Sequence, residues 1–362
     1  MSEVRVAAEA DPATLAGFDV IVDARSPGEF ALDHVPGAIN LPVLDDAERA
    51  EVGTIYVQES RFKARRVGGA YVARNVARHL QTAMADWPPA TRVLVYCWRG
   101  GMRSNAMAVI LAQVGWRTSV LAGGYRTYRR RVVRSLYEAG PTPRVILLDG
   151  ETGSGKTEVL TRLATRGVQT IDLEALAAHR GSLFGALPGR PQPSQKLFES
   201  RLLATLEALD LARPVVVEAE SSKVGQLMVP PVLWGAMEAA PRIVLSVPAE
   251  ARAAYLAEAY AELGRDPEAL VALLQRLPDR PGRKRLEAWS GLARAGDLKS
   301  LAAELIEAHY DPAYRRSRRK AEGAAEEAVA LPDLAADALD AAADQVARML
   351  ADERLAPQAW AP

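Results

Sequence analysis

A phosphate-binding pattern lies between positions 150 and 157. The stretch from Arg144 to Thr157 reads RVILLDGETGSGKT and contains a full match to G-x-x-x-x-G-K-[ST]. Glycines let consecutive backbone N–H groups converge on phosphate oxygens, and the lysine adds a mobile positive charge. The threonine hydroxyl suits Mg²⁺ when that metal accompanies the phosphate. The pattern predicts a phosphate-binding loop of Gly150, Gly153, Ser154, Gly155, Lys156 and Thr157. It does not define which phosphate compound binds.

The second candidate for chemistry is Cys97, the single cysteine of the chain. It follows a short apolar run, residues 91–96, and precedes a glycine-containing loop and a helical pattern. Open α/β sheets place ligands at such strand ends. The helix N-terminus together with Arg99 and Arg103 favours a thiolate. We therefore predict that Cys97 is a nucleophile assisted by these two arginines; the alternative is an inert, buried thiol.

A third candidate is Glu218, which ends the apolar run RPVVVE. P-loop proteins place an acidic residue at this point to hold Mg²⁺ or a water molecule. Glutamate in place of the more usual aspartate makes the match a loose one, but we include Glu218 among the candidate catalytic residues. The histidines are dispersed, and no histidine metal site is predicted. The sites to be positioned are therefore one cysteine loop and one phosphate loop.

Two α/β regions must position these loops. Short apolar runs alternate with helical patterns on both sides of a break at residues 140–143, which read GPTP. The runs lie at residues 18–24, 91–96 and 117–121 before the break, and at 145–148, 168–173, 213–218 and 241–247 after it. The pattern predicts an N-terminal domain over 1–138 and a second domain over 144–362. We expect the second to be a P-loop NTPase-like, doubly wound parallel sheet with a helical C-terminal region from residue 249.

Composition places the chain among ordinary globular proteins. It has 362 residues, 49% of them hydrophobic, and a formal net charge of +0. No apolar run approaches the roughly 18 residues of a membrane helix, and the N-terminus lacks an apolar signal core. We expect a cytoplasmic protein without a membrane partner. A nucleic-acid partner would have to bind local basic patches, because the overall charge is neutral.

Two segments could form such patches. Residues 125–137 read YRTYRRRVVRSLY, a helical and strongly basic pattern with interleaved tyrosines that could stack on bases. A second cluster lies at residues 283–285, with Trp289 nearby. Each segment alone is also compatible with a solvated helix face. The candidate tRNA contacts are Arg126, Arg129, Arg130, Arg283, Lys284 and Arg285.

The N-terminal region resembles the rhodanese (sulfurtransferase) family over roughly residues 5–130. The resemblance rests on DARSPGEFALDHVPGAINLP, from Asp23 to Pro42, and on CWRGGMRS, from Cys97 to Ser104. Common rhodaneses have four residues between the cysteine and the loop arginine, whereas this chain has five. Protein phosphatases built on the same fold share the longer spacing, so loop length alone leaves a phosphatase open. Against it, Tyr96 stands where those phosphatases carry histidine.

The chain as a whole is similar to the tRNA 2-selenouridine synthase family, from about Val20 to about Tyr314. The stretches that carry the resemblance are CWRGGMRS, LAGGYRTYR, GETGSGKT, DLEALAAHRGSLFG, PSQKLFESRL and VEAESSKVGQLMVP. The resemblance implies conversion of wobble 2-thiouridine in tRNA to 2-selenouridine through an S-geranyl intermediate. It implies the tRNA anticodon stem-loop, geranyl diphosphate and selenophosphate as substrates, no tightly bound cofactor, and Mg²⁺ as an optional ligand.

The sequence is also compatible with two other classes of function. One is a P-loop small-molecule kinase or ATPase with an accessory sulfurtransferase domain, which predicts nucleotide turnover without tRNA. The other is a non-catalytic tRNA-binding module, which the intact cysteine and phosphate loops argue against.

Overall fold

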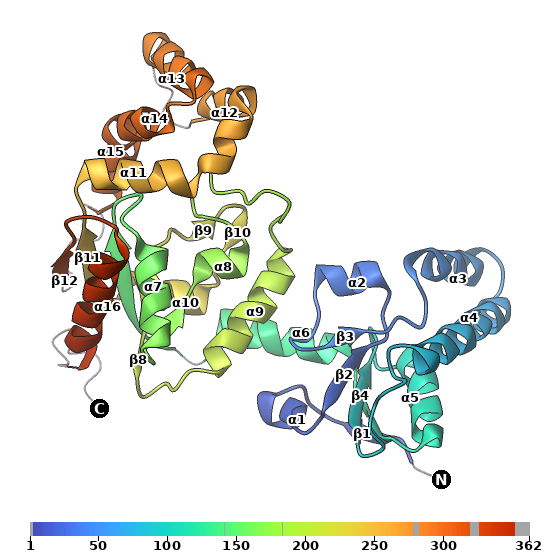
Figure 1. Ribbon diagram of the computed structural model, residues 1–362. Coiled ribbons are helices and arrows are strands. Elements are labelled where there is room, and N and C mark those ends of the chain that lie inside the picture. Colours follow the sequence, from blue (N-terminus) through green and yellow to red (C-terminus); the bar gives the residue numbers. More distant parts are fainter. Residues whose placement is uncertain (1–2, 141, 183, 278–281, 319–325, 352–362) are drawn as a thin grey trace. The chain divides into compact units, whose positions relative to one another are not determined.

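The computed structural model consists of two α/β units, each built around a five-stranded parallel sheet (Figure 1). The structure describes residues 3–140, 142–182, 184–277, 282–318 and 326–351. Unit 1 comprises Met1–Gly140 and Pro193–Glu207, and unit 2 comprises Pro141–Gln192 and Ala208–Pro362. The predicted α/β class, with one parallel sheet before the break and another after it, is confirmed. The end of the predicted second domain, residues 352–362, lies outside the described residues.

The sheet of unit 1 has the strand order β1-β5-β4-β2-β3, with all neighbours parallel. Its strands are β1 (Arg5–Ala7), β2 (Val20–Asp23), β3 (Ile39–Asn40), β4 (Arg92–Tyr96) and β5 (Arg117–Leu121). Its helices are α1 (Pro12–Ala16), α2 (Pro27–Leu32), α3 (Asp46–Gln58), α4 (Arg61–Gln81), α5 (Met102–Val114), α6 (Tyr125–Val133), the π-helical turn η1 (Arg134–Glu138) and α9 (Gln195–Glu207). Val22 of β2 and Val93 and Val95 of β4 are fully buried, as expected for a parallel sheet covered on both faces.

Helix α9 belongs to unit 1 although its sequence lies within the predicted second domain. Its carboxylates bind the basic helix of unit 1: Glu199 pairs with Arg129, and Glu207 pairs with Arg131. The Tyr137 hydroxyl also donates to Glu199, at 2.6 Å. The domain assignment from sequence therefore differs from the structural one, because these long-range ion pairs leave no local signal.

The loop after β4 is fixed by glycines. The amide of Tyr125 donates to the carbonyl of Cys97 at 2.8 Å, so the start of α6 fastens the cysteine loop. At this contact Gly124 has φ +60°, and a Cβ there would clash with the Cys97 carbonyl oxygen and the Gly100 amide nitrogen. Gly100 itself has φ +64°, and a Cβ on it would lie 2.6 Å from the carbonyl oxygen of Leu121. Only glycine fits either position.

The sheet of unit 2 has the strand order β12-β11-β6-β8-β7, again parallel throughout. Its strands are β6 (Arg144–Gly150), β7 (Gln169–Ile171), β8 (Pro214–Glu218), β11 (Arg242–Ser246) and β12 (Glu326–Ala330), and a separate hairpin is formed by β9 (Lys223–Val224) and β10 (Leu227–Met228). The C-terminal region, predicted to be helical from residue 249, also contains one strand, β12, which extends the sheet beside β11.

Some helices of unit 2 cover its sheet, and others form a separate helical lobe (Figure 1). They are α7 (Lys156–Thr165), α8 (Leu173–Ala177), α10 (Pro231–Glu238), α11 (Ala249–Ala259), the 3₁₀ turn η2 (Ala261–Arg265), α12 (Pro267–Leu274), α13 (Arg283–Ala295), α14 (Leu298–Leu305), the π-helical turn η3 (Ile306–Tyr310), α15 (Asp311–Arg318) and α16 (Ala336–Ala351). Helices α7 and α16 cover the sheet, and Leu339 and Val346 of α16 pack there.

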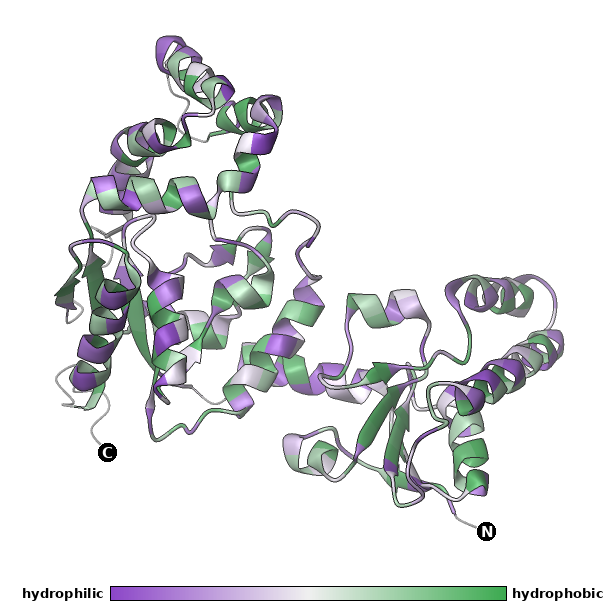
Figure 2. Cartoon of the chain, viewed as in Figure 1, coloured by the Kyte–Doolittle hydropathy of each residue, from purple (hydrophilic) through white to green (hydrophobic). Residues whose placement is uncertain are grey.

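Hydrophobic residues concentrate in the strands of both sheets, as Figure 2 shows. The helical lobe has its own core, which includes Leu270, Leu274, Trp289 and Leu301. Within the described ranges, no helix combines the length and the apolarity that crossing a bilayer needs.

The glycine contact beneath the cysteine loop gives a first prediction. Replacing Gly124 by alanine should destabilise the protein by roughly 1–3 kcal/mol, because the new methyl group meets backbone atoms at a positive φ. Gly69→Ala is the matched control, since a Cβ at this α4 position meets nothing within 4 Å and alanine favours helices. Urea denaturation measures both, and equal midpoints for the two variants would contradict the packing described.

Candidate functional site

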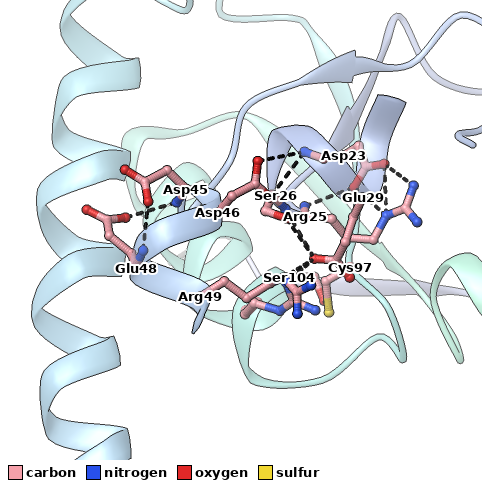
Figure 3. Close-up of polar contacts among 12 residues, drawn as sticks. Asp23, Arg25, Ser26, Glu29, Asp45, Asp46, Glu48, Arg49, Cys97 and Ser104 are labelled. Atoms are coloured by element: carbon pink, nitrogen blue, oxygen red, sulfur yellow. Dashed lines mark hydrogen bonds and ion pairs between the residues drawn. The ribbon is translucent and has the colours of Figure 1, made fainter. Parts of the chain in front are cut away.

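Cys97 lies directly after β4, at the carboxyl edge of the sheet of unit 1 (Figure 3). Only 3% of the residue is exposed, so the sulfur sits at the base of its loop. Its Sγ atom is 3.2 Å from the Oγ atom of Ser104, which itself donates to the Gly101 carbonyl at 3.1 Å. The predicted strand–loop–helix setting of the cysteine is thus present, and the Ser104 hydroxyl is a polar partner that sequence reasoning did not single out.

The two loop arginines have different surroundings. Arg99 is exposed, whereas the Nη1 atom of Arg103 donates to Glu29 of α2 at 2.9 Å. Burial opposes ionisation of Glu29, but the Arg103 guanidinium outweighs it and lowers the pKa of this carboxyl. The positive charge of Arg103 is therefore shared with a carboxylate, which orients the side chain beside the loop. Arg49 is the second cationic neighbour of Glu29, at 3.5 Å, and both side chains are drawn near Cys97 in Figure 3.

A buried ion pair supports this edge of the sheet. The guanidinium of Arg25 binds the Asp23 carboxylate through Nε and Nη2, at 3.0 and 2.6 Å. The same guanidinium lies 4.0 Å from the ring centre of Tyr125, the residue that fastens the cysteine loop. Breaking such a pair would leave an unpaired buried charge. Asp23 and Arg25 therefore support the cysteine loop structurally and do not face solvent.

Helix α6 divides its side chains between a buried and a basic face. Tyr125 and Tyr128 are buried, so their predicted availability for base stacking is wrong. Arg126 and Arg130 are exposed and line a concave surface that encloses a pocket of about 500 Å³. This surface is lined by Trp98, Tyr125, Arg126, Arg129, Arg130, Val133, Arg134, Glu138 and Lys196.

Trp98 is the aromatic residue that this surface exposes, and 37% of it is accessible. It follows Cys97 directly, so an aromatic face and a basic stripe adjoin the cysteine loop. Arg129 behaves differently from its exposed neighbours: it binds Glu199 and lies 3.8 Å from Asp33. Because carboxylates already neutralise Arg129, we assign it to the folding of unit 1 and not to a ligand surface.

The phosphate loop of unit 2 connects β6 to α7, the order that the sequence predicts. Gly150, Gly153 and Gly155 have φ angles of 151°, 81° and 75°, which side chains rarely adopt. The Nζ atom of Lys156 donates to the Gly150 carbonyl at 2.9 Å, so the ammonium lies over the loop. Ser154 is buried. The backbone of the loop and the start of α7 thus form an anion-binding concavity.

Carboxylates gather beside Thr157, the last residue of the motif. Its hydroxyl lies 3.2 Å from Oε2 of Glu174 and 3.4 Å from Oε1 of Glu218. Glu218 is fully buried at the end of β8, where burial raises the pKa of its carboxyl. Burial and the charge of Glu220 raise the pKa of Glu174 to about 7, against the opposing effect of Lys156. Sequence reasoning missed Glu174, although it stands in the DLEALAAHRGSLFG stretch.

The second basic cluster starts helix α13. Arg283, Lys284 and Arg285 are all exposed there, and Arg283 forms an i,i+4 pair with Glu287. Trp289 is 1% exposed and belongs to the core of the helical lobe, so it is not part of the exposed basic surface. Cations in a first helical turn face the positive end of the helix dipole and do not stabilise the helix.

These features define a class: a rhodanese-like unit with a cysteine loop, joined in one chain to a P-loop unit with an acidic cluster. Residues 7–131 match the family described as "Rhodanese-like domain", and residues 143–269 match the family described as "tRNA 2-selenouridine synthase AAA domain".

Similar proteins span most of the chain. The protein named tRNA 2-selenouridine synthase from Aeromonas salmonicida is 33% identical, over 81% of this chain and 86% of that protein. The protein of that name from Pseudomonas syringae pv. syringae is 33% identical, over 82% of this chain and 88% of its own length. The one from Nitrosomonas europaea is 36% identical, but the match spans 58% of this chain and about half, 55%, of that relative. The chain belongs to the tRNA 2-selenouridine synthase family.

The acidic cluster gives a prediction about stability and pH. In the unfolded chain Glu174 loses its proton near its ordinary pKa of 4.5, whereas in the folded protein it keeps the proton until about pH 7. The folded state therefore binds more protons between these values, and its stability falls as the pH rises through them. Glu174→Gln does not titrate, so the variant should gain stability relative to the parent protein from pH 4.5 to 7 and keep that gain above pH 7.

Chemical denaturation at a series of pH values measures this difference. The control is Glu268→Gln, because hydrogen bonding from Arg294 lowers the pKa of that exposed carboxyl and its loss should not stabilise the protein. A constant difference between Glu174→Gln and the parent protein across this range would mean that Glu174 titrates normally.

Proposed function

We propose that this protein converts 2-thiouridine at the wobble position of tRNA to 2-selenouridine in two steps. The observation that carries the proposal is family membership over most of the chain, supported by two intact reactive loops. The first step would use geranyl diphosphate to form S-geranyl-2-thiouridine, and the second would use selenophosphate to replace sulfur by selenium. The anticodon stem-loop is the proposed macromolecular substrate.

The phosphate loop suits the first step. The thiocarbonyl sulfur attacks C1 of the geranyl group, the bond from C1 to the diphosphate oxygen breaks, and the base loses its N3 proton. Lys156 and the N–H groups of the glycine loop would bind the diphosphate and stabilise the negative charge that develops on it. Glu174, with a pKa of about 7, is suited to accept the proton. A P-loop that activates an allylic diphosphate does not need to hydrolyse ATP.

The cysteine loop suits the second step. Geranylation turns a poor leaving group into a thiol that can depart, so selenium adds to C2 and geranylthiolate leaves with the electrons of the carbon–sulfur bond. Cleavage of the selenium–phosphorus bond by water releases phosphate. Cys97 would act on the selenium donor, either by binding it or by attacking it covalently, with Arg99 and the oriented Arg103 holding its phosphate group.

Basic surfaces of both units would bind the tRNA. Arg126 and Arg130 would contact backbone phosphates, and the exposed Trp98 ring offers a stacking surface for a base beside the cysteine loop. In unit 2 the exposed residues at the start of α13, Arg283 to Arg285, would contribute further phosphate contacts. Arg129 is left out of this interface because carboxylates bind it.

Magnesium is the ion that the phosphate loop could accept together with a diphosphate. The Thr157 hydroxyl and the Glu218 carboxylate are oxygen donors 3.4 Å apart, the donor chemistry that Mg²⁺ prefers. Among the described residues no cluster of three or more His, Cys, Asp and Glu side chains is arranged to hold a metal ion. Thr157 and Glu218 would therefore hold Mg²⁺ jointly with diphosphate oxygens, and the ion would supply charge neutralisation.

Nucleoside mass spectrometry tests the two steps separately. Purified protein is incubated with tRNA carrying 2-thiouridine, geranyl diphosphate and selenophosphate, and the digested tRNA is analysed. Lys156→Ala should lower geranylation about 100-fold or more, because a preorganised charge on the leaving group is lost. Cys97→Ala should still form S-geranyl-2-thiouridine but should not convert it to 2-selenouridine.

Each outcome bears on one assignment. Selenation by a folded Cys97→Ala variant would remove Cys97 from the second step. Unchanged 2-thiouridine with the parent protein, folded and bound to tRNA, would refute the proposed reaction and favour the kinase or ATPase alternative.

A further inference from the structure

An apolar cavity of about 70 Å³ lies in the helical lobe of unit 2. Helices α11, α12 and α14 and the turns η2 and η3 contribute its walls, and α11 packs against α14 (Figure 1). Most residues that line this cavity but not the phosphate-binding pocket are aliphatic, including Leu270, Leu298 and Leu301. A lining of hydrophobic and aromatic side chains is typical of small-molecule sites.

The cavity adjoins the phosphate-binding pocket. Five residues line both: Thr152, Ser182, Leu256, Tyr260 and Tyr310. These residues form the boundary between a region of backbone N–H groups and charge, and a region of aliphatic side chains. A ligand with an anionic head and an apolar tail would therefore place each part in a matching environment.

The boundary between the two pockets packs directly against the phosphate loop. A Cβ added at Gly153 would lie 2.8 Å from Cγ of Leu256 and 3.2 Å from the carbonyl oxygen of Arg252. Arg252, on the same helix as Leu256, is buried and donates to both Asp311 oxygens at 2.9 Å. It also pairs with Glu151 of the loop at 3.0 Å. The mouth of the cavity is thus held at a fixed place beside the phosphate loop.

Apolar cavities larger than a water molecule are few inside folded proteins. Interiors pack at the density of organic crystals, and unfilled volume lowers stability. The lobe nevertheless keeps small side chains on the cavity wall, Ala257 on α11 and Ala302 on α14, where larger ones would fill it. A bound apolar group supplies the missing contacts.

We propose that this cavity binds the geranyl chain of the diphosphate substrate and limits the length of the chain that the enzyme accepts. The inference rests on the proposed function and extends it, since it assigns the prenyl-binding site to residues of the helical lobe. The diphosphate would lie on the glycine loop, the first carbons would pass between Thr152 and Leu256, and the tail would reach Leu301 and Ala302.

Narrowing the cavity tests the proposal. Ala302→Phe should raise the KM for geranyl diphosphate about tenfold or more, while transfer from the shorter dimethylallyl diphosphate changes little. Ala303→Phe is the matched control, because Ala303 neighbours Ala302 on α14 but is exposed and does not line the cavity. Calorimetric titration with inorganic diphosphate should give the same affinity for both variants and the parent protein, since the phosphate loop is untouched.

A widening variant gives an independent test should Ala302→Phe fold poorly. Leu298→Ala should increase transfer from the longer farnesyl diphosphate relative to geranyl diphosphate. If Ala302→Phe and Ala303→Phe show the same KM for geranyl diphosphate, or if Leu298→Ala leaves the chain-length preference unchanged, the cavity does not hold the tail. These results differ from a failure of the proposed function itself, in which the parent protein would transfer no prenyl group from any of the three donors.

Discussion

Close backbone packing at two glycines determines where both reactive loops lie. At Gly124 the first turn of α6 meets the carbonyl of Cys97, and at Gly153 the phosphate loop meets Leu256 of the helical lobe. Neither contact leaves room for a Cβ, and both glycines have positive φ angles. The first contact sets Trp98 and the basic face of α6 beside the cysteine loop. The second sets the mouth of the apolar cavity beside the phosphate loop.

In unit 2, positive and negative groups lie against each other at the phosphate loop. The glycine loop, the start of α7 and Lys156 form a positive region, and Glu174, Glu218 and Glu220 lie against it. Burial raises the pKa of each carboxyl, so the cluster stores unfavourable electrostatic energy in the folded protein. Such a cost is common at functional sites, where residues are selected for the reaction and not for stability. The apolar cavity next to it also lowers the stability of the folded protein, because its volume is unfilled.

Local signals in the sequence were sufficient for the fold class and for the two loops. The phosphate loop and the cysteine loop each occupy one short stretch whose glycines, strand and helix are contiguous, so their conformation could be predicted. Helix α9 could not be assigned to unit 1, because Glu199 and Arg129 are 70 positions apart. Strand β12 reads EEAVA, which is short and half polar, and only its pairing with β11 makes it a strand.

Burial was the other property that the sequence could not supply. Tyr125, Tyr128 and Trp289 stand among arginines in the sequence but face the cores of their units, because helical periodicity turns neighbouring residues to opposite faces. Trp98 shows the opposite behaviour, because it follows a buried strand in the sequence but is partly exposed in the structure. The sequence did not indicate Glu174 as a site residue, because its contact with Thr157 depends on how the fold places the segment after β7 beside the phosphate loop.

The central claim is that the phosphate loop binds an allylic diphosphate as its substrate, and not a nucleotide. Calorimetric titration of the full chain with geranyl diphosphate and with ATP, each in the presence of Mg²⁺, tests it most directly. We predict that geranyl diphosphate binds, that Lys156→Ala abolishes this binding, and that an equal concentration of ATP does not displace it. Lys156-dependent binding and hydrolysis of ATP, with no binding of geranyl diphosphate, would contradict the claim.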